Sequence, residues 1–255
     1  MPTECIIDVI KIVMERMMKT VLITGGSRGI GREMVRLFAK MGYSVAFTYK
    51  SSDDLAQSLA DETGALAICA DSASEADVTR AVESTIAKFG KIDCLINNAA
   101  ISSFSVFTDL TLEDWNNTLA INLTGAFLYS KKVIPDMLKR KQGRIINISS
   151  IWGITGSSCE VHYSVAKAGL IGMTKALAKE LGPSGITVNA IAPGVIDTDM
   201  NKQLTDDDIK ALCDDTPLMR IGTVTDVARA ALFLASDSAD FITGDVLNVS
   251  GGFVI

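Results

Sequence analysis

The sequence predicts an α/β protein, a single doubly wound parallel sheet of about seven strands with helices on both faces. Two observations carry this prediction. From Lys19 onward, short β-branched runs alternate with longer stretches of helical periodicity, which is the rhythm of repeated strand–helix–strand units. Runs such as Val21-Leu22-Ile23 are apolar without interruption, as expected of strands that are buried on both faces.

The expected strands are the β-branched or apolar runs at residues 20–24, 44–49, 65–70, 92–97, 143–149, 186–192 and 246–249. The expected helices lie between most of these strands, at residues 30–40, 53–62, 75–89, 111–139, 163–181 and 225–234. Residues 19–255 contain no long linker, internal repeat or low-complexity run, so we expect them to form one domain.

The strand–helix rhythm breaks once, between Pro193 and Arg220. Within this stretch Thr205 precedes three aspartates, a pattern typical of the N-cap of a short helix with an acidic first turn. An insertion this late in an α/β domain forms a lid more often than a second domain. We therefore expect a small substrate lid near residues 194–220.

The composition is that of an ordinary globular protein. The chain has 255 residues, 48% of them hydrophobic and 21% charged, and its net charge is −6. This balance excludes disorder, collagen and coiled coil, and the acidic charge disfavours nucleic-acid binding. The five cysteines form no C-x-x-C motif and the chain has one histidine. We therefore expect free thiols, no metal site and a cytoplasmic location.

Residues 1–18 precede the first expected strand. Their apolar run contains Asp8 and Lys11, so it is too short and too charged to span a bilayer. A signal peptide would place positive charge before a clean apolar core, which this stretch does not do. Two interpretations stay open: an amphipathic helix, or a translation start that is placed too early, since several methionines offer later starts.

A glycine-rich turn lies between the first strand and the first helix and indicates a dinucleotide site. Glycines there let the backbone turn sharply and approach a pyrophosphate, which the N-terminus of the helix attracts. The spacing is T-G-x-x-x-G-x-G, and its place between a strand and a helix makes a purely structural turn the weaker interpretation. The residues expected to contact the cofactor here are Thr24, Gly25, Ser27, Arg28, Gly29, Ile30 and Gly31.

The end of the second strand indicates NADP(H) rather than NAD(H). NAD sites usually place a carboxylate there to bind the ribose hydroxyls. This strand instead ends with Tyr49 and Lys50, and no carboxylate follows until Asp53. We expect Lys50 and Arg28 to meet a 2′-phosphate; the alternative is that both are ordinary solvated charges.

Several polar side chains indicate acid–base chemistry at one edge of the sheet. Tyr163 and Lys167 are four residues apart in a helical stretch and so share a face. An ammonium beside a tyrosine favours the phenolate and lowers the tyrosine pKa from its ordinary value of about 10. Ser150 follows a strand and is placed to hydrogen-bond the same substrate oxygen. Asn98 follows another strand at the carboxyl edge, where open α/β sheets bind ligands.

With these motifs in order, residues 19–255 resemble the short-chain dehydrogenase/reductase family, whose fold is Rossmann-type. The resemblance implies an NADP-dependent oxidoreductase that acts on C=O and CH–OH groups. It rests on motifs in family order and spacing: Thr24 to Gly31, Asp71, Asn97-Asn98-Ala99, Asn122, Ser150, Tyr163, Lys167 and Pro193-Gly194. One departure is Ala100, where the family more often has glycine.

The resemblance also implies a role for each matching residue. Tyr163 would be the general acid in ketone reduction, and Ser150 would orient the carbonyl. Lys167 would lower the pKa of Tyr163 and hold the nicotinamide ribose, while Asn122 would support a water relay to Lys167. The remaining cofactor contacts that it implies are Tyr49, Lys50, Asp71, Ser72, Asn98, Ala99, Pro193, Gly194, Ile196 and Thr198.

Two branches of the family compete for the substrate. Residues 241–252 and 185–189 resemble those of 3-oxoacyl-(acyl-carrier-protein) reductases, which implies reduction of a 3-oxoacyl chain on a carrier protein. Lys139-Arg140-Lys141 would supply part of a basic face for the acidic carrier. Against this branch, Ser184 stands where it often has arginine.

Residues 150–163 are similar to elongation factor P 5-aminopentanone reductases, which reduce a ketone on a modified lysine of that translation factor. Glu160 would then face the substrate and favour an amine, and Trp152 would shape the pocket. Alternatively, Glu160 stabilises the first turn of its helix and Trp152 merely packs. We expect Cys159 to be a small, buried or half-buried filler and His162 to be a surface residue.

The helices expected at residues 111–139 and 163–181 carry more apolar residues than one core face needs: Phe127, Leu128, Val133, Leu170, Ile171 and Met173. Such a surplus usually marks a subunit interface. The resemblance implies a homotetramer, with a dimer as the alternative. A dinucleotide-binding sensor without catalysis also stays open, but the complete catalytic set argues against it.

Overall fold

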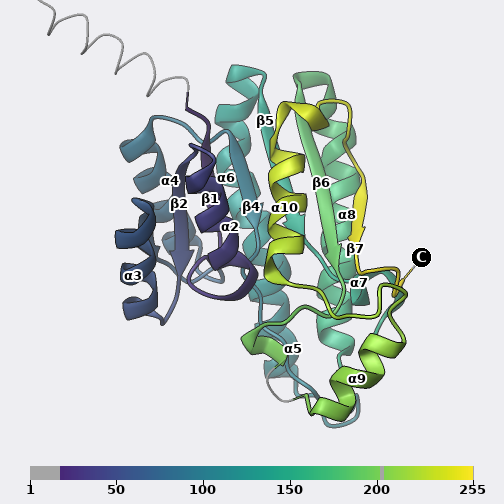
Figure 1. Cartoon of the computed structure of the whole chain (residues 1–255). Helices are drawn as coiled ribbons and strands as arrows, with labels where there is room; N and C mark the ends of the chain where they lie inside the picture. The colour runs from purple at the N-terminus through teal and green to yellow at the C-terminus, as the bar shows by residue number, and fades with distance from the viewer. Residues whose placement is uncertain (1–17, 202–203, 255) are drawn as a thin grey trace, which may run out of the picture.

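The computed structural model describes residues 18–201 and 204–254, and it contains the predicted doubly wound sheet (Figure 1). Seven parallel strands lie in the order β3-β2-β1-β4-β5-β6-β7. They are β1 (Thr20–Ile23), β2 (Ser44–Tyr49), β3 (Leu66–Cys69), β4 (Cys94–Asn97), β5 (Gly143–Ile148), β6 (Ile186–Pro193) and β7 (Val246–Val249). Both interpretations of the amino-terminal extension lie outside the described residues.

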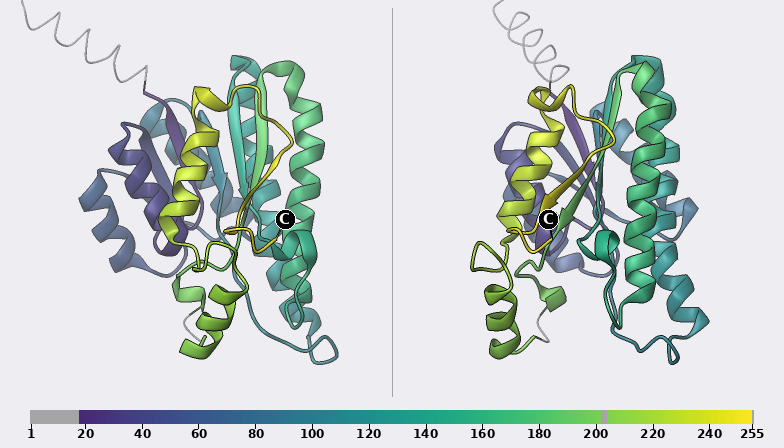
Figure 2. Two further views of the ribbon diagram at one scale, coloured as in Figure 1. Left: turned by 45° about the vertical axis from the view of Figure 1, so that its right-hand side comes forward. Right: turned by 90° about the vertical axis from the view of Figure 1, so that its right-hand side faces the viewer.

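Helices cover both faces of the sheet, which Figure 2 shows from two further sides. One face carries α2 (Gly29–Lys40), α3 (Asp53–Thr63) and α10 (Val224–Ala235). The other carries α4 (Glu75–Phe89), α6 (Gly125–Arg140) and α8 (Val161–Leu181). None of the described helices is long and apolar enough to cross a membrane.

The sheet separates two hydrophobic clusters. Val21 and Ile23 of β1 pack into the cluster under α2 and α10, whereas Leu22 packs into the cluster under α4 and α6. Successive side chains of a strand point to opposite faces, so a strand buried on both sides must be apolar at every position. Each such side chain contributes about 1.5–3 kcal/mol when it is fully buried.

The helical stretch expected at residues 111–139 is present, but it is not one uniform α-helix. The chain forms α5 (Leu112–Leu119), the π-helical turn η1 (Ala120–Thr124) and then α6. Asn122 lies in the π turn and is 1% exposed. Turns of this kind are frequent at functional sites. Hydrophobic periodicity continues across so narrow an interruption, so the sequence pattern does not show it.

The expected break in the rhythm after β6 is present. It contains α9 (Asp206–Asp214), and Thr205 is its N-cap as predicted. The Thr205 hydroxyl accepts from the N–H of Asp208, whose carboxylate accepts from the N–H of Thr205 in return. This capping box satisfies two backbone donors that the helix leaves free. In Figure 1, α9 lies beyond the carboxyl ends of the strands.

Candidate active site

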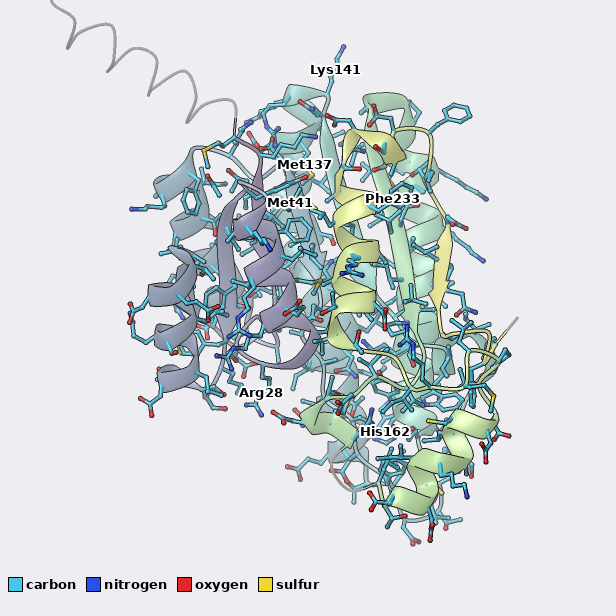
Figure 3. All side chains as sticks on the ribbon, in the orientation of Figure 1. Arg28, Met41, Met137, Lys141, His162 and Phe233 are labelled. Atoms are coloured by element: carbon cyan, nitrogen blue, oxygen red, sulfur yellow. The ribbon has the colours of Figure 1, made fainter. Side chains whose placement is uncertain are left out.

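The predicted site residues gather at the carboxyl edge of the sheet, because they follow the ends of β1, β4, β5 and β6. Figure 3 shows Arg28 and His162 at this end of the molecule and Lys141 at the opposite end. Open α/β sheets bind ligands at this edge, near the point where the strand order reverses. Here the reversal lies between β1 and β4.

The glycine-rich turn after β1 has a geometry that side chains would not permit. Gly25 and Gly29 have φ values of 67° and 53°, which L residues rarely adopt. A Cβ atom at Gly31 would lie 2.1 Å from the carbonyl oxygen of Gly25. The N-cap Arg28 makes no side-chain hydrogen bond to the first turn of α2, so that turn presents uncapped N–H groups to the loop. These features fit a pyrophosphate.

A hydrogen-bond network fixes this turn to the end of β4. The Thr24 hydroxyl accepts from the backbone N–H groups of Asn98 and Ala99, both at 2.9 Å. The Asn98 amide donates to the carbonyl oxygens of Thr24 and Gly25 at 2.9 and 3.0 Å. Thr24, Asn98 and Ala99 therefore hold the two strand ends together, and this shapes the floor of the site.

The two basic residues expected at a 2′-phosphate have polar partners within the chain. Lys50 forms an ion pair with Asp71 at 2.6 Å, and the Arg28 guanidinium donates to Ser52 Oγ at 2.8 Å. Burial raises the pKa of Asp71, but the Lys50 ammonium and the Ala73 N–H outweigh it and leave the pKa below its usual value. Lys50 thus lies beside a carboxylate that follows β3, a neighbour that the sequence pattern did not predict.

Ser150, Tyr163 and Lys167 are all buried at the junction of β5 and α8. Burial raises the pKa of Tyr163 to about 12, while a side-chain hydrogen bond with Ser150 lowers it in part. Burial also lowers the pKa of Lys167 to about 7. The Lys167 ammonium donates to the Ile148 carbonyl at 2.8 Å.

The pKa of Tyr163 moves upward in this structure, with burial as the largest cause. The expected lowering of this pKa by Lys167 stays a prediction. Burial disfavours both charged forms, the phenolate and the ammonium. A lysine with a pKa of about 7 is only partly charged at neutral pH, so it stabilises a phenolate weakly.

Asn122 faces the loop that follows β4. Its side-chain carbonyl accepts from the N–H of Ile101 at 2.9 Å, and its amide donates to the carbonyl of Ile101 at 2.8 Å. This reciprocal pair fixes the loop to the π turn η1. The expected contribution of Asn122 to a water relay stays a prediction.

Glu160 is buried, with an exposed fraction of 6%. Its carboxylate accepts from Ser102 Oγ at 2.5 Å and from Ser157 Oγ at 3.4 Å. Glu160 is the N-cap residue of α8, yet its side chain makes no capping hydrogen bond. The first-turn interpretation stays a prediction, because a favourable charge at a helix N-terminus needs no hydrogen bond. The negative charge of Glu160 raises the pKa of Tyr163.

The prediction of His162 as a surface residue is wrong, because its exposed fraction is 0%. The helix begins two residues earlier than expected, at Val161, so His162 lies inside its first turn. Its Nε2 atom lies 2.9 Å from Ser103 Oγ. No local pattern indicates Ser102 and Ser103, which belong to an irregular loop about 60 residues earlier in the chain. Cys159 is half-buried, as expected.

The remaining site residues line the same edge. Trp152 lies in the short helix α7 (Trp152–Thr155), and its ring meets the Phe253 ring edge-on at 6.0 Å. The Pro193 carbonyl accepts from the N–H of Ile151 at 3.0 Å. A Cβ atom at Gly194 would lie 2.9 Å from the Cα of Ser250, so only glycine fits this close approach. Ile196 and Thr198 follow it on the way to α9.

The run Lys139-Arg140-Lys141 lies away from the site. It ends α6 just before β5 begins, at the amino edge of the sheet, as the position of Lys141 in Figure 3 shows. Arg140 is also engaged by Asp93 and Asp136, at 2.9 and 2.8 Å. The suggestion that this run contributes to a basic face at the mouth of the site is therefore wrong.

Comparisons with known proteins agree with the fold and the motifs. The family model described as "Enoyl-(Acyl carrier protein) reductase" matches residues 25–254. The chain is 41% identical to a 3-oxoacyl-[acyl-carrier-protein] reductase of Staphylococcus epidermidis, over 92% of this chain and 99% of the relative. It is 42% identical to the reductase of the same name from Chlamydia muridarum, over 92% of this chain and 96% of that relative. A solved short-chain dehydrogenase/reductase of Serratia marcescens, a mutant, matches with a TM-score of 0.87 and 36% identity, covering 92% and 97% of the two chains. The chain belongs to the short-chain dehydrogenase/reductase family, and it is an oxidoreductase.

Proposed function

We propose that this protein reduces a ketone to a secondary alcohol with NADPH. The observation that carries the proposal is the convergence of Ser150, Tyr163 and Lys167 beside the glycine-rich turn, at the carboxyl edge of the sheet. When bound, NADPH supplies the hydride that the carbonyl carbon receives. The residues of the chain then have to orient the carbonyl and deliver one proton to its oxygen.

Tyr163 donates that proton. Its hydroxyl is protonated at neutral pH, which is the form that a general acid requires. Ser150 Oγ accepts a hydrogen bond from the N–H of Trp152 at 3.1 Å. In this proposal its own proton orients the carbonyl by donating to the substrate oxygen. Lys167 lies behind the tyrosine and takes part in returning a proton to it, with Asn122 supporting this relay.

Arg28 and Lys50 hold the 2′-phosphate of NADPH in this proposal. Both are exposed, Arg28 in the turn before α2 and Lys50 directly after β2. Tyr49 stands where a carboxylate would select NADH. The adenine would lie beside Asp71 and Ser72. A ribose would lie beside Asn98 and Ala99. Residues 193–198 surround the nicotinamide, and residues 194–220, which include α9, form the substrate lid.

The first candidate substrate is a 3-oxoacyl thioester. It is supported by the names of the relatives, which are 3-oxoacyl-[acyl-carrier-protein] reductases at about 40% identity over most of the chain. A carrier protein would be the macromolecular partner, and the chain would work as a cytoplasmic homotetramer.

The second candidate is a ketone that carries an amine, such as the modified lysine of elongation factor P. Glu160 is a buried carboxylate whose negative charge raises the pKa of Tyr163. The nearby cation is Lys167, and burial lowers its pKa to about 7. A buried negative charge favours an ammonium over a phosphopantetheine phosphate.

One assay tests the proposal and separates the candidates. Loss of absorbance at 340 nm is followed with NADPH and either an acetoacetyl carrier thioester or ketone-modified elongation factor P. The proposal expects NADPH to be consumed with at least one of them, and the substrate with the higher kcat/KM identifies the branch. No consumption with either substrate, nor with a wider panel of ketones, would support the non-catalytic sensor instead.

A further inference from the structure

A short loop after β4 is tied to the start of α8 by three hydrogen bonds. Ser102 Oγ donates to Glu160, Ser103 Oγ lies 2.9 Å from His162 Nε2, and the Ser105 N–H donates to the carbonyl of the residue before Glu160 at 2.9 Å. We call these three contacts, between residues 102–105 and 159–162, the clasp. The clasp lies directly before Tyr163 in the chain.

The turn that enters α8 is held in an unfavourable conformation. Cys159 has a φ of 61°, in the left-handed region that residues with a Cβ rarely adopt. Such a conformation persists only where neighbouring contacts impose it, and it clusters at functional sites. The carbonyl of Cys159 is the acceptor for Ser105, so the clasp holds the strained residue itself.

His162 is a polar residue at a buried position, where an apolar side chain would need no hydrogen-bond partner. Its side chain is fully buried. Within residues 18–201 and 204–254, its Nδ1 atom has no hydrogen-bond partner, whereas Nε2 contacts Ser103. A buried imidazole with one nitrogen unsatisfied is unfavourable. The contact with Ser103 is therefore the interaction that a polar side chain at this position makes possible.

We propose that His162 is a positioning residue for the substrate half of the site. Through Ser103 it holds the loop at residues 101–105 against the first turn of α8, and so it fixes where Tyr163 and Glu160 meet the substrate. The other end of the loop is fixed by Asn122 through Ile101. The cofactor half, built around Thr24 and Asn98, has separate contacts. The effect on rate rests on the proposed ketone reduction.

Two substitutions that introduce a side-chain amide distinguish the contribution of Nε2 from that of Nδ1. The side-chain amide of Gln reaches about as far as Nε2, whereas that of Asn reaches only as far as Nδ1. His162→Gln should keep the contact with Ser103 and hold kcat/KM within threefold of the parent. His162→Asn should lower kcat/KM about tenfold, mainly through kcat. NADPH affinity, measured by fluorescence titration, should stay within twofold for both variants.

A double-mutant cycle completes the test. Ser103→Ala should lower kcat/KM as much as His162→Asn does, and the double variant should be no worse than either single variant. Equal losses for the Gln and Asn variants, additive losses in the cycle, or a matching loss of NADPH affinity would each overturn the positioning role.

Hydrogen exchange gives a readout that does not require turnover. His162→Asn should speed exchange of the Ser105 N–H, while amides in the middle of α8 exchange as in the parent. Unchanged exchange at Ser105 would overturn the clasp even if activity fell. If the parent reduces no ketone, the proposed function fails, and the exchange measurement alone still decides whether His162 holds the loop.

Discussion

The Lys167 ammonium nitrogen lies 5.4 Å from the centroid of the Tyr163 ring and donates its hydrogen bond to the Ile148 carbonyl. The ammonium nitrogen therefore lies over the face of the tyrosine ring. Both are buried, and burial moves their pKa values in opposite directions, to about 12 for Tyr163 and about 7 for Lys167. Between these values both groups are neutral.

The low pKa of Lys167 makes folding stability depend on pH. An unfolded lysine keeps its proton up to about pH 10.4, so above about pH 7 the unfolded state binds more protons than the folded state. Stability contributed by Lys167 therefore rises with pH between these values, by about 1.4 kcal/mol per pH unit. The raised pKa of Tyr163 acts with the opposite sign, but only above about pH 10.

Urea unfolding of the parent and of Lys167→Met between pH 7.5 and 9.5 measures this effect. The difference in unfolding free energy, parent minus variant, should increase with pH. Lys175→Met, on an exposed position of the same helix, is the matched control and should give a difference that is flat with pH. A flat difference for Lys167→Met as well would show that its pKa is not depressed.

The cofactor preference depends on the cations near the end of β2. A charge-assisted contact to a phosphate contributes about 1.5–3 kcal/mol, so the parent should prefer NADPH over NADH by at least tenfold. Lys50→Asp should erode that preference, mainly by raising KM for NADPH, because it places a second carboxylate beside Asp71. Lys40→Asp, at the exposed end of α2, is the control. Equal use of both cofactors by the parent would contradict the assignment.

Glu160→Gln tests whether the buried carboxylate selects for a substrate that carries an amine. The variant keeps the shape and the hydrogen-bonding capacity toward Ser102 and Ser157 but removes the charge. After desolvation, an ammonium partner would retain about 1–2 kcal/mol, so kcat/KM for an amino-ketone should fall about tenfold. A neutral 3-oxo ester should react almost as before. Equal small changes for both substrates would make Glu160 structural.

Fewer apolar side chains of the long helices are exposed than the sequence indicates. Leu128, Val133 and Leu170 are buried within the chain, whereas Phe127 is 48% exposed.

Sedimentation should give about four times the 27.2 kDa of one chain. Phe127→Glu should shift the protein to smaller species, and Leu55→Glu, an equally exposed change on α3, should not. A stable single chain at micromolar concentration in the parent would refute the tetramer.

The sequence predicts those features that depend on local pattern. The strands follow from β-branched and apolar runs, and the parallel sheet with helices on both faces follows from the alternation of strands and helices. The Thr24–Gly31 turn is recognisable because only glycine permits its φ values and close contacts. Thr205 is recognisable as an N-cap because its hydroxyl and the following aspartates act within one helical turn.

Other features depend on contacts between distant segments and leave no local signal. The burial of His162 depends on a loop serine about 60 residues earlier, and the ion pair of Lys50 depends on the end of a neighbouring strand. The π turn at Asn122 changes the helical period for a single turn only. The tyrosine pKa could not be predicted from spacing, because burial rather than the nearby lysine decides its direction.

Replacement of Tyr163 by Phe tests the central claim most directly. The substitution keeps the ring and removes the proton that the carbonyl oxygen requires, and general acid catalysis typically contributes about 10²–10⁴-fold. With the substrate that the parent reduces fastest, the rate of NADPH consumption should fall by a comparable factor while NADPH affinity stays nearly unchanged. A rate within threefold of the parent would contradict the role of Tyr163 and, with it, the proposed mechanism.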